Sequence, residues 1–419
     1  MKLKIFKNSI LFPMTIGIVL LVISCASNTK KEQAHNNLPK SQTQEDSLII
    51  VGANQTDKYL SLLENKNVGI VANQTSVIFK GSKKKQYIHL VDSLLSLNVN
   101  IVKAFAPEHG FRGIADAGEH IADGVDIETG LPVISLYGKN RKPSEDHLKD
   151  IDIMIFDIQD VGVRFYTYIG TLHYLMEACA EANIPLLILD RPNPNGHYID
   201  GPILEPEYKS FVGMHPTPIV HALTIGEYAQ MINGESWLEN KIQCDITVIP
   251  VKNYTHQTTY SLPIKPSPNL PNDVAINLYA SLCFFEGTNV SIGRGTEKQF
   301  QIVGIPDINL EKFNYTFTPQ PNFGAKHPKH QAKECHGYDL SAVDPLSEIK
   351  LEWLIDFYKA NQENNPNQEF YNRFFIKLAG TKNIRNQIEA GLIESEIKAT
   401  WQEGLEAFKV IREKYLIYE

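Results

Sequence analysis

IVKAFAPEHGFRGIADAG, residues 101–118, joins an apolar run of strand type to a glycine-rich loop that carries ionisable side chains. The apolar run, 101–106, stops at Pro107, and Glu108 and His109 follow at once. In open α/β sheets, ligands bind in the crevice beyond the carboxyl ends of the strands. An ionisable pair at that position is hard to explain by packing, so it predicts a functional site at the end of this strand.

Apolar runs of strand type alternate with helical patterns between about residues 50 and 200. We expect strands at 67–72, 101–106, 133–136, 151–157 and 185–190, and helices at 87–97 and 170–182. The run IDIMIFD is almost continuously apolar, which is typical of parallel strands covered on both faces. The alternation predicts an α/β fold with a Rossmann-like, doubly wound, mostly parallel sheet. Neither a G-x-G-x-x-G after the first strand nor a Walker A motif occurs, so no cofactor is expected.

A second, smaller domain of α+β type is expected after this sheet. A capping-box pattern at Thr224 and Glu227 predicts a helix over 224–233, and an alternating run predicts a strand over 245–251. The composition then shifts to Thr, Ser, Pro and Asn between 253 and 272. We therefore predict a Rossmann-like domain over 48–256 and a carboxyl-terminal domain over 257–419 that ends in helices.

The amino terminus has the layout of an export signal. Three lysines precede an apolar run over 10–23, and VISC, residues 22–25, resembles a bacterial lipobox. That resemblance implies cleavage before Cys25 and attachment of lipid to it, with an uncleaved anchor helix as the alternative. We expect a signal peptide over 1–24 and a lipidated, disordered tether over 25–47, because that segment cannot bury apolar area. The mature protein would then be an exported lipoprotein, anchored to a membrane and facing the periplasm or the cell surface.

Charge and cysteine content exclude several other classes of protein. A net charge of −8 argues against a nucleic-acid partner, because phosphate neutralisation needs a clustered Lys/Arg surface. No C-x-x-C occurs among the cysteines, so neither a zinc site nor a disulfide scaffold is indicated. The histidines show no spacing typical of metal ligands, and no metal is expected.

Several acidic residues follow predicted strands. Two carboxylates that flank the scissile bond are the usual apparatus of glycoside hydrolysis. Glu108 is favoured, because it follows a proline in a glycine-rich loop where it caps no obvious helix. An Asp at a strand end can equally cap a helix or pair with Arg. The acidic residues at these positions are Glu108, Asp157, Asp160 and Asp190, with Glu119 a little further on, and the catalytic candidates kept from them are Glu108, Glu119, Asp157 and Asp160.

Arg164, Arg191 and Arg294 each lie in a predicted loop, where a guanidinium can bind a carboxylate with two parallel hydrogen bonds. Any one of them can equally form an internal salt bridge, but three together favour an anionic ligand. Tyr166 and Tyr168 could stack on a sugar or belong to the core. The candidates for substrate binding are Asn73, His109, Arg112, Arg164, Tyr166, Tyr168, Arg191, Asn193 and Arg294.

Eight motifs in this order resemble the NamZ family of exo-β-N-acetylmuramidases, over essentially the whole chain from about residue 50. They are NQT (73–75), PEHGFRG (107–113), DAGE (116–119), TGLPVISLYG (129–138), FDIQDVGVRFYTY (156–168), LDRPNP (189–194), GRGT (293–296) and REKYLIY (412–418). The resemblance implies a glycosidase that releases N-acetylmuramic acid from the non-reducing ends of peptidoglycan fragments in cell-wall recycling. It also implies an active cleft between two domains, with Glu108 as a catalytic residue and Glu119, Asp157 or Asp160 as the second group.

Two other functions are also compatible with the sequence. A lipoprotein that captures muropeptides without cleaving them would also have two domains around a cleft. An amidase or esterase has less support, because no G-x-S-x-G elbow is present. N-acetylmuramic acid carries a lactyl carboxylate, which leads to the hypothesis that Arg164, Arg191 or Arg294 selects muramyl over glucosaminyl ends.

Overall fold

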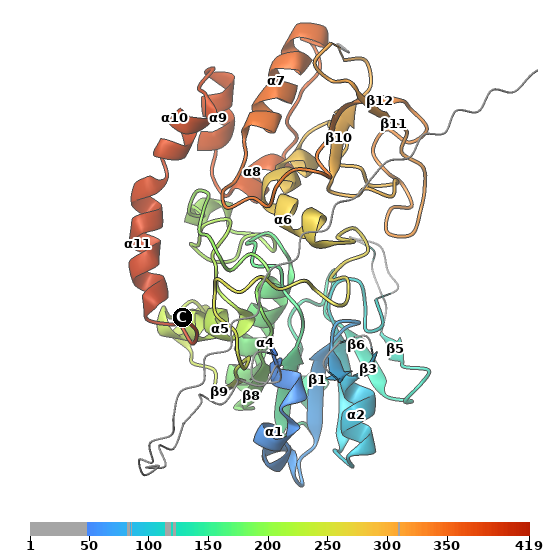
Figure 1. Cartoon of the computed structure of the whole chain (residues 1–419). Coiled ribbons are helices and arrows are strands. Elements are labelled where there is room, and N and C mark those ends of the chain that lie inside the picture. Colours follow the sequence, from blue (N-terminus) through green and yellow to red (C-terminus); the bar gives the residue numbers. More distant parts are fainter. Residues whose placement is uncertain (1–47, 82–83, 85, 114–118, 120–122, 309–310) are drawn as a thin grey trace, which may run out of the picture. The chain divides into compact units, whose positions relative to one another are not determined.

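The computed structural model describes residues 48–81, 84, 86–113, 119, 123–308 and 311–419 (Figure 1). All of these residues belong to the second of two units, residues 44–419. The predicted signal peptide, Cys25 and the tether lie outside the described residues, as do residues 116–118 of the DAGE motif. Among the helices that are described, none has the length and apolar character needed to cross a membrane.

In the described part of the chain, seven strands form the main sheet, in the order β5-β6-β4-β1-β7-β8-β9. Every neighbouring pair is parallel except β5 with β6. When the parallel strands are numbered along the chain, the sheet has the order 3-2-1-4-5-6 of Rossmann folds, which confirms the predicted fold class. The strands are β1 (Val68–Ala72), β4 (Ile101–Ala106), β5 (Gly124–Val125), β6 (Pro132–Ser135), β7 (Ile153–Asp157), β8 (Leu186–Leu189) and β9 (Ile246–Ile249).

The central strands β1, β7 and β8 are buried along their whole length, as their continuous apolar runs predict. Successive side chains enter two different cores, so that Met154 and Phe156 pack on one face of the sheet and Ile153 and Ile155 on the other. The first core includes α4 (Tyr168–Ala182) and α5 (Ile225–Gly234), and the second includes α1 (Thr56–Leu63) and α2 (Leu90–Ser96). Helices on both faces make the sheet doubly wound.

The helix α5 begins at the predicted capping box. The Thr224 hydroxyl accepts a hydrogen bond from the backbone N–H of Glu227, and the Glu227 carboxylate accepts one from the backbone N–H of Thr224. These two bonds satisfy N–H groups that have no partner within the helix, so the prediction from the sequence is confirmed.

The predicted helix over 87–97 is wrong in its first turn. Residues Gln86–His89 form β3, which pairs antiparallel with β2, Val77–Lys80. Asn54 holds this hairpin from outside, since its side chain donates to the Phe79 carbonyl and accepts from the Phe79 N–H. The apolar spacing at the start of this stretch is compatible with a helix and with a strand. Pairing with β2 favours the strand.

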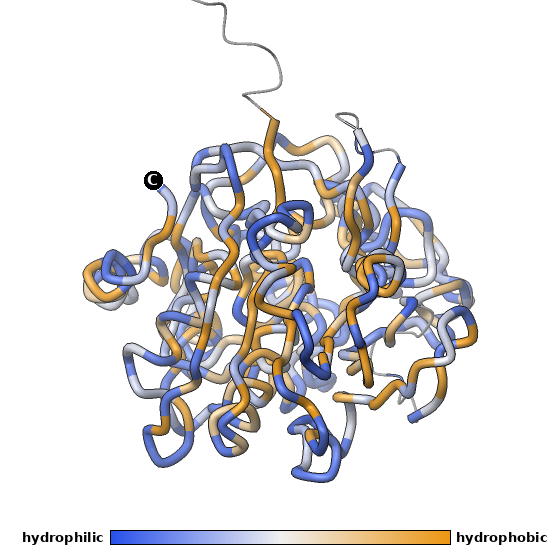
Figure 2. The backbone as a smooth tube through the Cα atoms, turned by 90° about the horizontal axis from the view of Figure 1, so that it is seen from below, coloured by the Kyte–Doolittle hydropathy of each residue, from blue (hydrophilic) through white to orange (hydrophobic). Residues whose placement is uncertain are grey.

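The carboxyl-terminal part is smaller and mixes strands with helices. It contains α6 (Asp273–Leu282) and an antiparallel sheet of order β10-β12-β11. Apolar stretches of the chain lie toward the middle of the fold, with hydrophilic loops around them (Figure 2). The domain boundary at 256 stays a prediction.

The remaining elements are α3 (Glu145–Leu148), β10 (Ile302–Ile305), β11 (Tyr315–Phe317), β12 (Cys335–Asp339), α7 (Glu352–Asn364), α8 (Phe374–Ala379), α9 (Asn383–Glu389), α10 (Glu394–Ala399) and α11 (Gln402–Glu413).

Candidate active site

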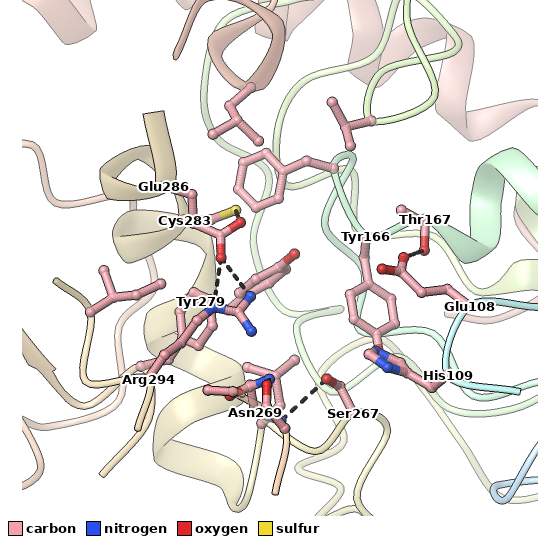
Figure 3. A pocket seen from close by; sticks show the side chains of 18 of the residues that line it. Glu108, His109, Tyr166, Thr167, Ser267, Asn269, Tyr279, Cys283, Glu286 and Arg294 are labelled. Atoms are coloured by element: carbon pink, nitrogen blue, oxygen red, sulfur yellow. Dashed lines mark hydrogen bonds and ion pairs between the residues drawn. The ribbon is translucent and has the colours of Figure 1, made fainter. Parts of the chain in front are cut away.

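A cavity of about 1150 Å³ lies at the carboxyl edge of the sheet. One wall comes from the loops after β4, β6 and β7, and the other comes from α6, the loop over 291–300 and the loop over 324–329 (Figure 3). The candidates from the sequence that line it are Glu108, His109, Glu119, Tyr166, Tyr168 and Arg294. The other candidates do not line it.

Glu108 lies two residues beyond the end of β4 and is partly buried. The Thr167 hydroxyl donates a hydrogen bond of 2.7 Å to Oε2 of Glu108 (Figure 3). The Tyr137 hydroxyl also hydrogen-bonds to this carboxyl group. Burial first, and then the Glu108 charge, raise the pKa of Tyr137, so the phenol stays protonated at neutral pH. Two hydroxyls therefore fix the orientation of the carboxyl group.

His109, next to Glu108, has a φ of 71°, in the left-handed region that residues other than glycine rarely adopt. Gly110 follows with a φ of 81°, so the chain turns sharply directly after Glu108. The His109 side chain is buried and lines the cavity. Backbone strain of this kind is concentrated at functional sites, because the surrounding structure must hold it in place.

Arg294 and Glu286 form an ion pair on the opposite wall (Figure 3). The guanidinium donates from Nε at 2.9 Å and from Nη2 at 2.5 Å to the same oxygen, Oε1 of Glu286. Behind this pair, the Lys329 ammonium donates to the backbone carbonyls of residues 285, 288 and 290. Burial lowers the pKa of Lys329 to about 8. Two cationic groups and one carboxylate thus lie together on this wall.

Tyr166 and Tyr168 line the cavity, and their rings contact each other edge to face at 4.8 Å. Both hydroxyls donate to the Pro266 carbonyl, at 2.8 and 3.2 Å. Burial raises the pKa of both phenols, which remain neutral donors. Glu119 also lines the cavity, where its carboxylate forms an ion pair of 2.6 Å with Lys326.

Asp157 and Arg191 bind each other inside the protein. The Arg191 guanidinium donates to both carboxylate oxygens, at 2.6 and 2.8 Å, and both side chains are buried. Asn73 lies in the same region, where its amide donates to the Tyr168 hydroxyl at 2.9 Å and its oxygen accepts from Thr75. This network occupies the carboxyl ends of β1, β7 and β8, where the strand order of the sheet reverses.

Arg164 is buried, and its guanidinium donates to four backbone carbonyls, those of residues 202, 217, 378 and 379. It therefore joins the loop after β7 to the end of α8. Asp160 is also buried, accepts the Gly162 N–H at 2.7 Å, and has its pKa raised by burial to about 7. Neither side chain lines the cavity.

Arg112 and Asn193 also make internal contacts. Arg112 donates to Asp92 and Asp126, and the bond to Asp126 is 2.7 Å. The Asn193 amide donates to the Leu223 carbonyl, and its oxygen accepts from the Asn195 N–H. Both residues hold loops near the strand ends in place.

Sequence reasoning missed Tyr137, Thr167 and Glu286 in the cavity. Tyr137 and Thr167 belong to motifs quoted above but carry no charge, so nothing in the pattern separated them from packing residues. Glu286 ends an apolar segment, and its only signal was a charge directly after a predicted core run. Among the described residues, no group of His, Cys, Asp and Glu is suited to a metal ion.

The fold and the cavity define a Rossmann-like α/β protein with acidic side chains in a cavity at the carboxyl edge of its sheet. Two family profiles match consecutive parts of the chain. They are described as "Exo-beta-N-acetylmuramidase NamZ, N-terminal", over 68–274, and "Exo-beta-N-acetylmuramidase NamZ, C-terminal", over 277–418. The chain belongs to the NamZ exo-β-N-acetylmuramidase family.

Known proteins agree with this assignment. The peptidoglycan beta-N-acetylmuramidase NamZ of Bacillus subtilis (strain 168) is 37% identical over 427 residues, covering 97% of this chain and 99% of that protein. A crystal structure of a DUF1343 family protein from Bacteroides fragilis is 49% identical with a TM-score of 0.79, covering 88% of this chain and 99% of that one. A second DUF1343 structure from the same organism is 30% identical with a TM-score of 0.76, covering 89% and 100%.

Proposed function

We propose that this protein is an exo-acting glycoside hydrolase that releases N-acetylmuramic acid from the non-reducing ends of peptidoglycan fragments. Membership of the NamZ family and a relative named as a peptidoglycan beta-N-acetylmuramidase support this activity. The observation that carries it in the structure is Glu108, which faces a cavity large enough for amino sugars and is held by two hydroxyl groups. Hydrolysis of a glycosidic bond requires an acid at the leaving oxygen, and Glu108 takes that role.

The second carboxylate is Glu119. Among the three candidates left open by the sequence, Glu119 lines the cavity, whereas Asp157 and Asp160 are buried away from it. Glu286 also lines the cavity, but two nitrogens of Arg294 bind one of its oxygens on a mostly buried wall, which makes it a weaker base or nucleophile. Glu119 also has a cationic partner, Lys326, but that ion pair is more exposed to solvent and therefore weaker. Glu119 acts either as the nucleophile or as the base that activates water.

The experiment that tests the activity is an incubation of the full chain with a muramyl-glucosaminyl disaccharide and, separately, with 4-nitrophenyl β-N-acetylmuramide. We expect free N-acetylmuramic acid from the disaccharide and nitrophenol from the chromogenic substrate. A protein that only captures muropeptides would bind the disaccharide and release neither product, and that outcome would overturn the proposal.

Export and anchoring are part of the proposed function. The lipobox-like VISC and the following polar segment support a lipoprotein that meets wall fragments outside the cytoplasm. Lipid on Cys25 would concentrate the enzyme at a membrane, with the segment over 25–47 as its tether. Cell fractionation tests this: Cys25→Ala should move the protein out of the membrane fraction, and an unchanged distribution would contradict the proposal.

A further inference from the structure

We propose that Arg294 binds the lactyl carboxylate of the muramyl unit. In the free enzyme Glu286 binds this guanidinium, and the substrate's carboxylate displaces it. This inference rests on the proposed function and makes Arg294 the residue that distinguishes muramyl from glucosaminyl ends. These two sugars differ at the lactyl ether, which places one additional negative charge on the muramyl unit. A site that selects it therefore needs a cation at a defined place in the cavity.

Arg294 lies on the wall opposite Glu108 (Figure 3). A sugar whose glycosidic oxygen meets Glu108 can thus extend its substituents toward Arg294. Nε and Nη2 of Arg294 bind Glu286, while Nη1 makes no hydrogen bond to any described residue and points into the cavity. Nη1 therefore offers the first hydrogen bond to the ligand's carboxylate, which then replaces Glu286 at Nε and Nη2.

The other two arginines named in the hypothesis form hydrogen bonds inside the protein, outside the cavity. Arg191 binds Asp157 with two hydrogen bonds, and Arg164 binds four backbone carbonyls. Both guanidinium groups are buried away from the cavity. The hypothesis that one of three arginines selects the muramyl unit thus narrows to Arg294.

The pair with Glu286 shows that this site already accommodates a carboxylate. A resident carboxylate at an arginine is the group that a ligand's carboxylate can replace, since both make the same charge-assisted hydrogen bonds. The ammonium of Lys329 lies close enough to Glu286 and Arg294 to interact with both charges. With two cations against one carboxylate, this wall can take up a second negative charge at little electrostatic cost.

The conformation and contacts of the loop that carries Arg294 restrict the motion of this side chain. Gly293 and Gly295 on either side have φ values of 76° and 81°, which a residue with a side chain adopts only with strain. Ser291 pairs with Gly304 through two backbone hydrogen bonds, of 2.8 and 3.0 Å. The guanidinium also lies 5.2 Å above the ring of Phe300. A fixed arginine loses little conformational entropy when it binds, which favours discrimination between ligands.

The experiment measures the binding of two free sugars to the full chain by calorimetry. The sugars are N-acetylmuramic acid and its methyl ester, in which a methyl group on the lactyl carboxyl removes the negative charge. For Arg294→Met we expect about 10- to 100-fold weaker binding of the acid, the usual loss for a hydrogen bond to a charged group, with the ester unchanged. For Glu286→Gln we expect tighter binding of the acid, because the competing carboxylate is gone, and again no change for the ester.

Arg385→Met is the matched control, because Arg385 forms an exposed ion pair with Glu389 on α9, outside the cavity lining. It should leave both affinities unchanged. Equal losses for acid and ester in Arg294→Met, or an unchanged preference for the acid, would overturn the inference. So would weaker binding of the acid by Glu286→Gln, because Glu286 would then only support the site. Each of these results can occur in an enzyme that still releases sugar from the disaccharide, so the proposed function is tested separately.

Discussion

Glu108 and Asp157 are both acidic residues at the carboxyl end of one sheet, but their surroundings give them different roles. Asp157 is fully buried, and Arg191 binds both of its oxygens. A buried carboxylate needs such a partner, because the interior cannot solvate an isolated charge. Glu108 faces a cavity and has neutral hydroxyl groups at hydrogen-bonding distance. The first arrangement stabilises the fold, and the second places a carboxyl group at the wall of the cavity.

Asp157→Asn is predicted to destabilise the protein. The substitution leaves the Arg191 charge buried without its counter-ion, which costs about 3–5 kcal/mol when one partner of a buried pair is removed. Urea unfolding measures this free energy. Asp344→Asn, at an exposed position, should change it by less than about 0.5 kcal/mol. Equal stability of the two variants would show that the Asp157–Arg191 pair contributes nothing to the fold.

Asp160 predicts a pH dependence of stability. Burial raises its pKa from 3.8 to about 7, so between these values the folded protein keeps a proton that the unfolded chain has lost. Stability contributed by this group therefore falls as the pH rises from about 4 to 7, by up to about 1.4 kcal/mol per pH unit, and stays level above that range.

Asp160→Asn removes this titration and keeps an oxygen that can accept the Gly162 N–H. Urea unfolding at pH 5, 6, 7 and 8 should show the wild type losing stability relative to the variant between pH 5 and 7. Curves that run parallel over this interval would contradict a raised pKa for Asp160.

Among the elements, α5 begins at a capping threonine that the sequence predicts, and the hydroxyl of this residue makes two hydrogen bonds in the structure. The Thr224 hydroxyl caps the helix and also donates to the buried carboxylate of Asp190 at 2.7 Å. Thr224→Ala should therefore lower the free energy of unfolding by about 1–2 kcal/mol, the range for loss of an N-cap. Thr224→Ser keeps the hydroxyl and is the control. If the two variants were equally stable in urea unfolding, the hydroxyl would have no structural role.

The sheet could be predicted from the sequence because its strands are short, apolar and separated by helical patterns. The run IDIMIFD identifies β7 without any tertiary information, since a parallel strand covered on both faces is apolar throughout. The β2–β3 hairpin and the three-stranded sheet of β10, β11 and β12 could not be predicted in this way. The strands β2, β3 and β11 are partly exposed and lack a continuous apolar run, and β12 pairs with β10 and β11 across long connections.

The site could be predicted only in part, for the same physical reason. Glu108 and Arg294 stand in glycine-rich loops, and that local signal suffices to select them. Arg164 and Arg191 also follow strands, but their partners are backbone carbonyls and a carboxylate brought close by folding. Spacing along the chain does not measure those distances, so the sequence leaves ligand binding and internal pairing as equal alternatives.

In the whole molecule, the end of the chain returns to the edge of the first sheet. The Tyr418 hydroxyl donates to Asp190 at 2.6 Å and accepts the Val251 N–H at 2.8 Å. The Glu227 carboxylate accepts the backbone N–H groups of Ile417 and Tyr418. These buried bonds join the helical carboxyl-terminal part to the sheet that carries Glu108.

Tyr418→Phe removes the hydroxyl and leaves two buried polar groups without this partner. The expected loss is about 1–3 kcal/mol, the cost of an unsatisfied buried group, measured by urea unfolding. Tyr87→Phe, at a tyrosine that is 54% exposed, should have no measurable effect. A Tyr418→Phe protein as stable as the wild type would rule out a stabilising role for this contact.

The general acid role of Glu108 is the central claim, and leaving-group dependence tests it most directly. Release of N-acetylmuramic acid should be measured for Glu108→Gln on the natural disaccharide and on an aryl muramide whose phenol leaves without protonation. We expect a loss of about 10²- to 10⁴-fold on the disaccharide and a much smaller loss on the activated substrate. Glu119→Gln should instead slow both substrates. Near-normal turnover of the disaccharide by Glu108→Gln would contradict the account.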